Sequence, residues 1–164
     1  MGQRMTRLCF AVLAALGAAR ARADGARADL SVEFGAPTAG AGLRVPSDGD
    51  GENVLETAGG AAARRVKGNR AQYLYVVIEH ADYRQGPVDA YVSADVFDDG
   101  VSRVSVQYDR AAAEPNIATR YTAAESTYLL VGSGRWRTLH FYLPQLRLGH
   151  GQNHGADFRF HAPN

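Results

Sequence analysis

The alternation of apolar and polar positions in the second half of the chain predicts a series of short β-strands. Residues 73–83 are rich in apolar and β-branched side chains, which is typical of a buried strand. Residues 88–100 alternate and end in an Asp-Asp-Gly turn signal. Strands at this spacing, separated by Gly, Asp, Pro and Ser, predict an all-β fold, an antiparallel β-sandwich or barrel. Further strands are expected over residues 101–110, 127–132, 135–149 and 156–162.

The pattern is weaker over residues 30–72. Residues 30–35 alternate and predict one strand, after which turn-forming residues dominate. We expect the glycine-punctuated segment that follows to be a loop with a short strand near residues 63–66. Residues 111–126 are also loop-like, and a short strand is expected near Ile117–Tyr121.

The first 23 residues have the pattern of a secretory signal peptide. Two arginines precede an apolar run of about a dozen residues, and the small residues Ala21 and Ala23 follow it. The run is short for a membrane span. We therefore predict cleavage after Ala23, with Ala28 as a second site, and an uncleaved anchor or a buried helix as the alternative. The protein would then be secreted or periplasmic, with no membrane attachment after cleavage.

Cleavage at this position would change both the charge and the chemistry of the protein. The leader carries four arginines and no acidic residue, so the net charge would fall from +1 to −3. A mildly acidic domain has no electrostatic reason to bind nucleic acid or anionic lipid. Cys9 is the only cysteine, so the mature chain would have no disulfide, thiol nucleophile or cysteine-based zinc site.

Five segments of the chain carry a resemblance to a known group of domains. In order, they are GLRVPSDGDGEN, YLYVVIEHADY, VSVQYDR, GSGRWRTLHFYLP and GHGQNHGADFRF. Together they resemble the galactose-binding-like jelly-roll β-sandwich of secreted bacterial proteins, over residues 30 to 160. The resemblance implies a carbohydrate-binding or architectural module that accompanies a glycan-active enzyme.

The resemblance and the leader together suggest a domain organisation. We expect a signal peptide over 1–23, a disordered mature terminus over 24–29 and one jelly-roll domain over 30–164. Domains of this group usually have one more strand after the segment that GADFRF matches. Either the sandwich lacks an edge strand, or the sequence is part of a longer protein with a further domain downstream.

The last predicted strand carries the first pair of candidate binding residues. Asp157 and Arg159 are two positions apart, so both point to one face of the strand, while Phe158 and Phe160 point into the core. The polar pair could bind the hydroxyls of a sugar. The interpretation we favour is structural, a clamp in which the two side chains pair with each other and with loop backbone.

The loop-like segments supply the remaining candidates for a glycan site. Sugars present flat C–H faces to aromatic rings, and their hydroxyls need polar side chains nearby. Tyr83 and Tyr121 are the tyrosines expected in loops, where they could form exposed platforms. Arg84, Asn116 and Arg120 are polar neighbours that could complete such a site.

One acidic segment could bind a metal ion. Asp48, Asp50 and Glu52 alternate with glycines, and oxygen ligands in a flexible loop suit Ca²⁺. The segment has no EF-hand pattern, and jelly-roll domains of the group that the chain resembles often hold a structural calcium. The alternative interpretation is a solvated acidic turn.

Catalytic motifs give little support for an enzyme. The sequence contains no G-x-S-x-G, H-E-x-x-H or P-loop motif. Three functions therefore remain open: a non-catalytic carbohydrate-binding or accessory module, a structural module that packs against another domain, and a small hydrolase. We favour the first.

Overall fold

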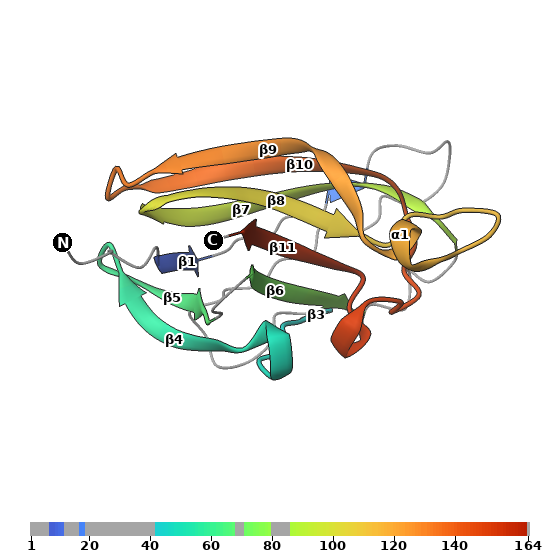
Figure 1. The fold of residues 1–164 in the computed structure, drawn as a ribbon, viewed down its shortest axis with the longest axis horizontal. Coiled ribbons are helices and arrows are strands. Elements are labelled where there is room, and N and C mark those ends of the chain that lie inside the picture. The colour runs from blue at the N-terminus through green and yellow to red at the C-terminus, as the bar shows by residue number, and fades with distance from the viewer. Residues whose placement is uncertain (1–6, 12–16, 19–41, 68–70, 80–85, 164) are drawn as a thin grey trace.

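The chain folds into a mostly antiparallel β structure (Figure 1). The computed structural model describes residues 7–11, 17–18, 42–67, 71–79 and 86–163. The strands are β1 (Arg7–Ala11), β2 (Gly17–Ala18), β3 (Leu43–Arg44), β4 (Asn53–Ala58), β5 (Ala61–Val66), β6 (Ala71–Ile78), β7 (Val88–Asp99), β8 (Val101–Tyr108), β9 (Thr122–Val131), β10 (Trp136–Leu146) and β11 (Phe158–Pro163). The short helical elements are η1 (Gly49–Gly51), α1 (Ile117–Arg120) and η3 (Asn153–Gly155).

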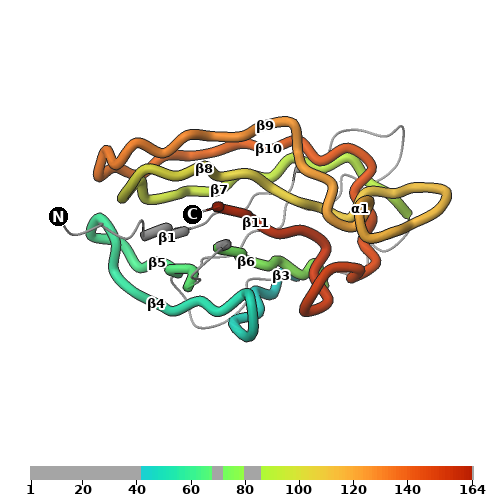
Figure 2. The backbone as a smooth tube through the Cα atoms, in the orientation of Figure 1, coloured from blue at the N-terminus to red at the C-terminus, as the bar shows by residue number. Residues whose placement is uncertain are grey.

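The strands form two sheets. The first has the order β10-β7-β1-β5-β4, and β2 also pairs with β7. The second has the order β3-β6-β11-β8-β9, and β11 pairs with both β6 and β8. In the tube drawing, η1 and η3 lie on the same side of the molecule, next to β6 (Figure 2).

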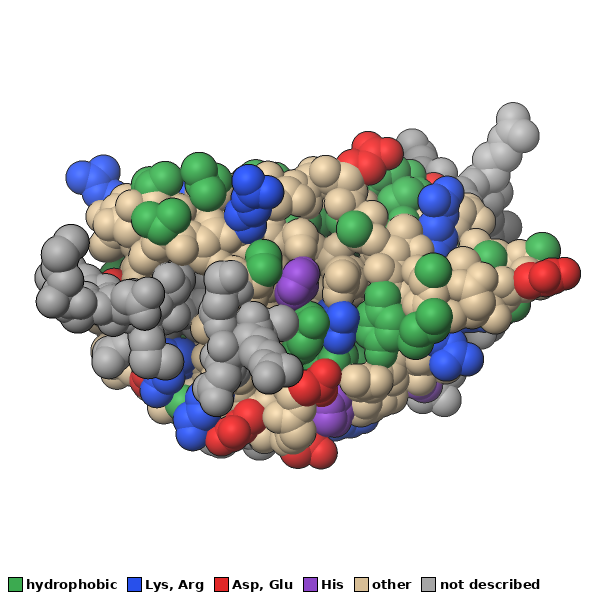
Figure 3. Space-filling model, viewed as in Figure 1, with side chains coloured by type: hydrophobic (Ala, Val, Ile, Leu, Met, Phe, Trp, Pro, Cys, Tyr) green, Lys and Arg blue, Asp and Glu red, His purple; other side chains and the backbone are tan. Residues whose placement is uncertain are grey.

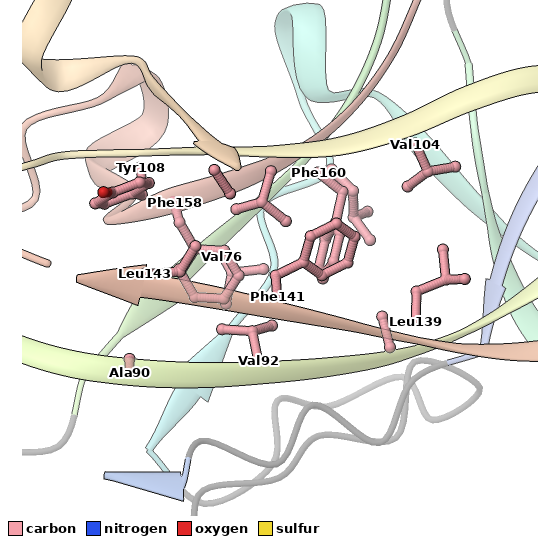
Figure 4. Packing of buried hydrophobic residues seen from close by; sticks show 14 of the residues in the cluster. Val76, Ala90, Val92, Val104, Tyr108, Leu139, Phe141, Leu143, Phe158 and Phe160 are labelled. Atoms are coloured by element: carbon pink, nitrogen blue, oxygen red, sulfur yellow. The ribbon is translucent and has the colours of Figure 1, made fainter. Parts of the chain in front are cut away.

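The main hydrophobic core lies between the two sheets. Val92 on β7 and Phe141 on β10 pack from the first sheet, and Val104 on β8 and Phe160 on β11 pack from the second (Figure 4). Each of these side chains comes from an alternating strand, so the residues between them point outward. The predicted all-β architecture is thus confirmed, and the side chains outside the core are free to line the two outer faces.

Most of the predicted strands are confirmed, although β9 begins at Thr122, within the segment 111–126 that was expected to be loop-like. Two further differences concern β4 and α1. β4 was expected to be a loop, and α1 forms where a short strand was expected near Ile117–Tyr121, so that prediction was wrong. The Oδ1 atom of Asn116 accepts hydrogen bonds from the backbone N–H groups of Ala118 and Thr119, at 2.9 and 3.2 Å. The Thr119 hydroxyl in turn accepts a hydrogen bond from the Asn116 N–H at 2.9 Å. This reciprocal cap favours a helical turn over a strand.

The predicted leader and the first sheet overlap. β1 lies within residues 1–23 and pairs with both β5 and β7, with Cys9 opposite Arg65 and Phe97. Removal of the leader would therefore leave the facing edges of β5 and β7 without β1 between them. The signal peptide stays a prediction, and the strand expected over 30–35 lies outside the described residues. In the described part of the chain, no helix is both long and apolar enough to cross a bilayer.

Candidate functional site

The outer face of the second sheet brings aromatic and polar side chains together. On β6, Tyr73 and Tyr75 alternate with inward-facing apolar residues. On β11, Arg159 is in register with Tyr75 and His161 with Tyr73. Gln107 on β8 lies opposite Arg159 on the other side of β11. Three neighbouring strands therefore contribute to one cluster.

The Arg159 guanidinium is the centre of this cluster. Its side chain is nearly buried, with 8% of the residue exposed. Its Cζ atom lies 3.7 Å from the ring centroid of Tyr73 and 4.3 Å from that of Tyr121. Its Nε atom donates to Oε1 of Gln107 at 2.8 Å. The rings stabilise the cation through their π electrons, and the amide holds its orientation.

Tyr75 connects this guanidinium to an acidic turn. Its hydroxyl accepts a hydrogen bond from Nη1 of Arg159 at 2.6 Å and donates one to Oδ2 of Asp50 at 2.9 Å. Burial, together with the hydrogen bond to Asp50, raises the pKa of Tyr75. The phenol therefore stays protonated at neutral pH. Its hydroxyl connects the Arg159 cation to the Asp50 anion through two hydrogen bonds.

The turns η1 and η3 close one side of the cluster around Asp50. The Asp50 carboxylate contacts Nε2 of His154 at 2.8 Å and accepts a hydrogen bond from Nδ2 of Asn153 at 3.2 Å. Burial acts to raise the pKa of Asp50, but the hydrogen bonds from His154, Tyr75 and Asn153 outweigh it and hold the pKa below its ordinary value. A side chain at Gly51 would press on the Tyr75 ring, since its Cβ would lie 2.6 Å from Cδ2.

Tyr121 reaches the same cluster from the end of α1. Its hydroxyl donates to Oδ1 of Asn153 at 3.0 Å and accepts from the Asn153 backbone N–H at 3.0 Å. These two bonds fix the Tyr121 ring against Arg159. The loop that carries η3 and the turn at α1 are thus joined beside the guanidinium.

His161 extends the cluster along β11. Its ring stacks on Tyr73, with the centroids 5.1 Å apart and an interplanar angle of 22°. Burial, together with the nearby charge of Arg159, lowers the pKa of His161. The imidazole is therefore largely neutral at neutral pH and offers a flat ring with hydrogen-bonding nitrogens.

Asp157 serves a different purpose from Arg159. It is fully buried, and its carboxylate accepts hydrogen bonds from the backbone N–H groups of Ile78 and His150, each at 2.9 Å. Burial raises the pKa of Asp157, and these two hydrogen bonds partly oppose the shift. The side chain fastens the loop before β11 to the end of β6. Asp157 thus bonds to loop backbone, as the clamp interpretation expects, whereas Arg159 bonds to Gln107 and Tyr75.

The remaining predicted ligand-binding residues are spread over the structure. Tyr83 and Arg84 lie outside the described residues. Asn116 uses its side-chain oxygen to cap α1, and Arg120 has an exposed side chain while its carbonyl accepts from Nε2 of Gln152 at 2.6 Å. Of the predicted set, the structure brings Tyr121 and Arg159 together.

The three predicted calcium ligands do not converge. Asp48 and Asp50 both face the His154 ring, at 3.1 and 2.8 Å, whereas Glu52 contacts Nζ of Lys67 at 3.0 Å. Within the described ranges, no group of three or more His, Cys, Asp or Glu side chains is arranged to hold a metal ion. Calcium binding stays a prediction for a chelator experiment.

Sequence reasoning passed over four members of the cluster: Tyr73, Tyr75, Gln107 and His161. The signal was present in the alternation of the strands, since tyrosines at i and i+2 in YLYVVI share the face opposite the core residues. The same holds for Arg159 and His161 in DFRFHA. What the alternation could not supply was the strand order, which places β6 and β8 on either side of β11.

The cluster is partly exposed at Tyr73, Tyr121 and His161, whereas Tyr75 and Arg159 are buried. Figure 3 shows that, on the face drawn, a blue basic side chain lies among green ones, with purple histidines and red acidic side chains beside them. No family model, curated protein or solved structure matches the chain. The function is therefore argued from the chemistry of the cluster.

Proposed function

We propose that this protein is an exported, non-catalytic module that binds carbohydrate on the outer face of its second sheet. The observation that carries the proposal is the guanidinium of Arg159, which is held against the rings of Tyr73 and Tyr121 at the surface of a rigid sheet. The jelly-roll, galactose-binding-like type that the sequence resembles is part of the proposal, as is its role as an accessory to a glycan-active enzyme.

The chemistry of the cluster suits a sugar. Tyr73, Tyr121 and His161 are partly exposed rings that can stack on the C–H face of a pyranose. Gln107, Asn153 and Arg159 carry amide and guanidinium groups that can bond to its hydroxyls. Because these side chains come from strands and from turns tied together by hydrogen bonds, the face is preorganised, and little ordering is lost on binding.

The proposal is tested by affinity electrophoresis on a panel of soluble polysaccharides. We expect at least one polysaccharide to retard the protein, and Tyr73→Ala to abolish the retardation, because the variant removes a stacking ring. The matched control is Tyr142→Ala on the other sheet, where Tyr142 stacks on Tyr91 at a centroid distance of 4.9 Å and is 41% exposed. Repeating the gels with a calcium chelator tests the predicted metal at the same time.

Two outcomes would contradict the proposal. One is a folded protein that no polysaccharide retards. The other is retardation that Tyr142→Ala removes and Tyr73→Ala leaves intact, which would place binding on the first sheet. Unchanged retardation in the presence of the chelator would show that glycan binding does not need calcium, and it would leave the proposed glycan site unaffected.

A structural packing module is the second candidate, and one surface feature favours it. Val101, Leu129 and Val131 are all more than half exposed at the shared end of β8 and β9, and Val101 pairs directly with Val131. An exposed apolar group of this kind suits contact with another protein domain. Self-association or partner binding that Leu129→Ser abolishes, without any glycan binding, would favour this function.

A further inference from the structure

Arg159 has an unusual electrostatic environment for a buried cation. Charged side chains as buried as this one normally have an ionic partner, because removing a charge from water is costly. Among the described residues, Arg159 forms no ion pair with an aspartate or glutamate. Its link to Asp50 runs through the neutral hydroxyl of Tyr75.

Some N–H donors of the guanidinium also have no hydrogen-bond partner among the described residues. Of its five N–H donors, the bonds to described residues use the one on Nε and one on Nη1. The donors on Nη2 have no partner among those residues. The second N–H of Nη1 also has no partner among those residues, and one N–H from each of Nη1 and Nη2 can form a fork that matches the two oxygens of a carboxylate.

The acid that is linked to Arg159 through Tyr75 already has other partners. Asp50 accepts from Tyr75 and Asn153 and contacts His154, so its negative charge is shared among three groups of the η1 and η3 turns. Asp50 is therefore linked to the guanidinium through Tyr75 rather than through an ion pair. The rings of Tyr73 and Tyr121 beside Arg159 exclude water there, which strengthens any charge-assisted hydrogen bond to a ligand.

We infer that the glycan is anionic, and that Arg159 binds an acidic sugar substituent, a uronate carboxylate or a sulfate ester, at the edge between Tyr73 and Tyr121. This inference rests on the proposed function, and it names the ligand class of the same site. The aromatic rings contact the pyranose, and the guanidinium binds the negatively charged substituent of the sugar. The acidic group supplies the counterion that the described residues do not.

The test compares polysaccharides with the same backbone and different charge. Binding of the full chain, as expressed, to polygalacturonate and to its methyl ester is measured by calorimetry at one ionic strength. Sulfated carrageenan and neutral agarose form the second pair, which separates sulfate from carboxylate. We expect an acidic polymer to bind about tenfold or more tightly than its neutral counterpart.

Two variants test whether Arg159 causes the preference for the acidic polymer. Arg159→Gln should reduce binding of the acidic polymer to the level of the neutral one. Gln107→Glu should have the same effect without removing the arginine, because a carboxylate placed 2.8 Å from Nε would be an internal counterion. Since Gln107→Glu preserves size and adds an ion pair, it should fold even if Arg159→Gln does not. Tyr142→Ala should retain the preference.

The outcomes separate the two claims. Equal binding of the acidic and neutral polymers, or a preference that survives Gln107→Glu, would overturn the anionic inference and leave the glycan site intact. A folded protein that binds none of the four polymers would overturn the inference, and failure on the wider panel would overturn the proposed function as well.

Discussion

Single residues in this protein hold charge in places where water is largely excluded. Arg159 is stabilised by rings and neutral hydrogen-bond partners, whereas Asp109 is stabilised by a bidentate ion pair with Arg147, at 2.7 and 3.2 Å. Both are buried, yet only the aspartate has an opposite charge in direct contact among the described residues. This contrast separates a structural charge from one that is available to a ligand.

Asp98 is a buried carboxylate whose contribution to stability should depend on pH. Its Oδ1 accepts from the N–H groups of Val131 and Gly132, at 3.0 and 2.7 Å, and its Oδ2 accepts from the Ser133 hydroxyl at 2.8 Å. Burial acts to raise the pKa of Asp98, but these hydrogen bonds outweigh it and lower the pKa from 3.8. The stability that they supply is present above pH 3.8 and is lost as the pH falls through the folded-state value.

We therefore predict that Asp98→Asn lowers the free energy of unfolding at pH 7 by about 1.5–3 kcal/mol. The difference from the wild type should shrink as the pH falls below 3.8. Urea unfolding at several pH values measures it, and Asp99→Asn in the same turn, where the side chain is exposed, is the control. A difference that stays constant down to pH 2 would be inconsistent with this role for the carboxylate.

Elements were predictable from the sequence where alternation is strong. β7, β8 and β10 follow from their alternating apolar positions, and the inward direction of Val104 and Val106 is confirmed by their burial. β4 was missed because NVLETA is flanked by glycine-rich turns. Among the described strands it pairs with β5, and this pairing rather than its own pattern makes it a strand. The candidate cluster was predicted in part, since Arg159 and Tyr121 were named, whereas the neighbours on β6 and β8 depend on strand order.

The helical turn α1 gives a prediction at the scale of an element. Asn116→Ala removes the cap, and we expect it to lower the free energy of unfolding by about 0.5–2 kcal/mol. Because α1 leads directly into Tyr121, glycan binding should also weaken by several fold. Thermal unfolding and calorimetry measure the two effects, with Glu114→Ala in the same loop as control. A loss of stability with unchanged affinity would show that α1 does not position Tyr121.

The whole molecule depends on two sheets that share one core. The hydrophobic clusters among the described side chains draw on residues between Leu43 and Ala162. β1 lies within the predicted leader, so cleavage would remove it from the first sheet.

We accordingly predict that the exported protein is shortened and folded. Mass spectrometry of protein recovered from the periplasm should show a chain beginning at Asp24, and this chain should unfold cooperatively. An intact N-terminus in the exported protein would contradict the signal-peptide prediction. Loss of cooperative unfolding on cleavage would show that β1 is an essential part of the sheet.

The central claim is that glycan binds on the face formed by β6, β11 and β8. The most direct measurement is an NMR titration of the isotope-labelled protein with oligosaccharides from the polysaccharide that retards it most. We predict that the perturbed resonances belong to Tyr73, Gln107, Tyr121, Arg159 and His161. Perturbations that gather instead around Tyr91 and Tyr142, or spectra unchanged by saturating ligand, would contradict the account.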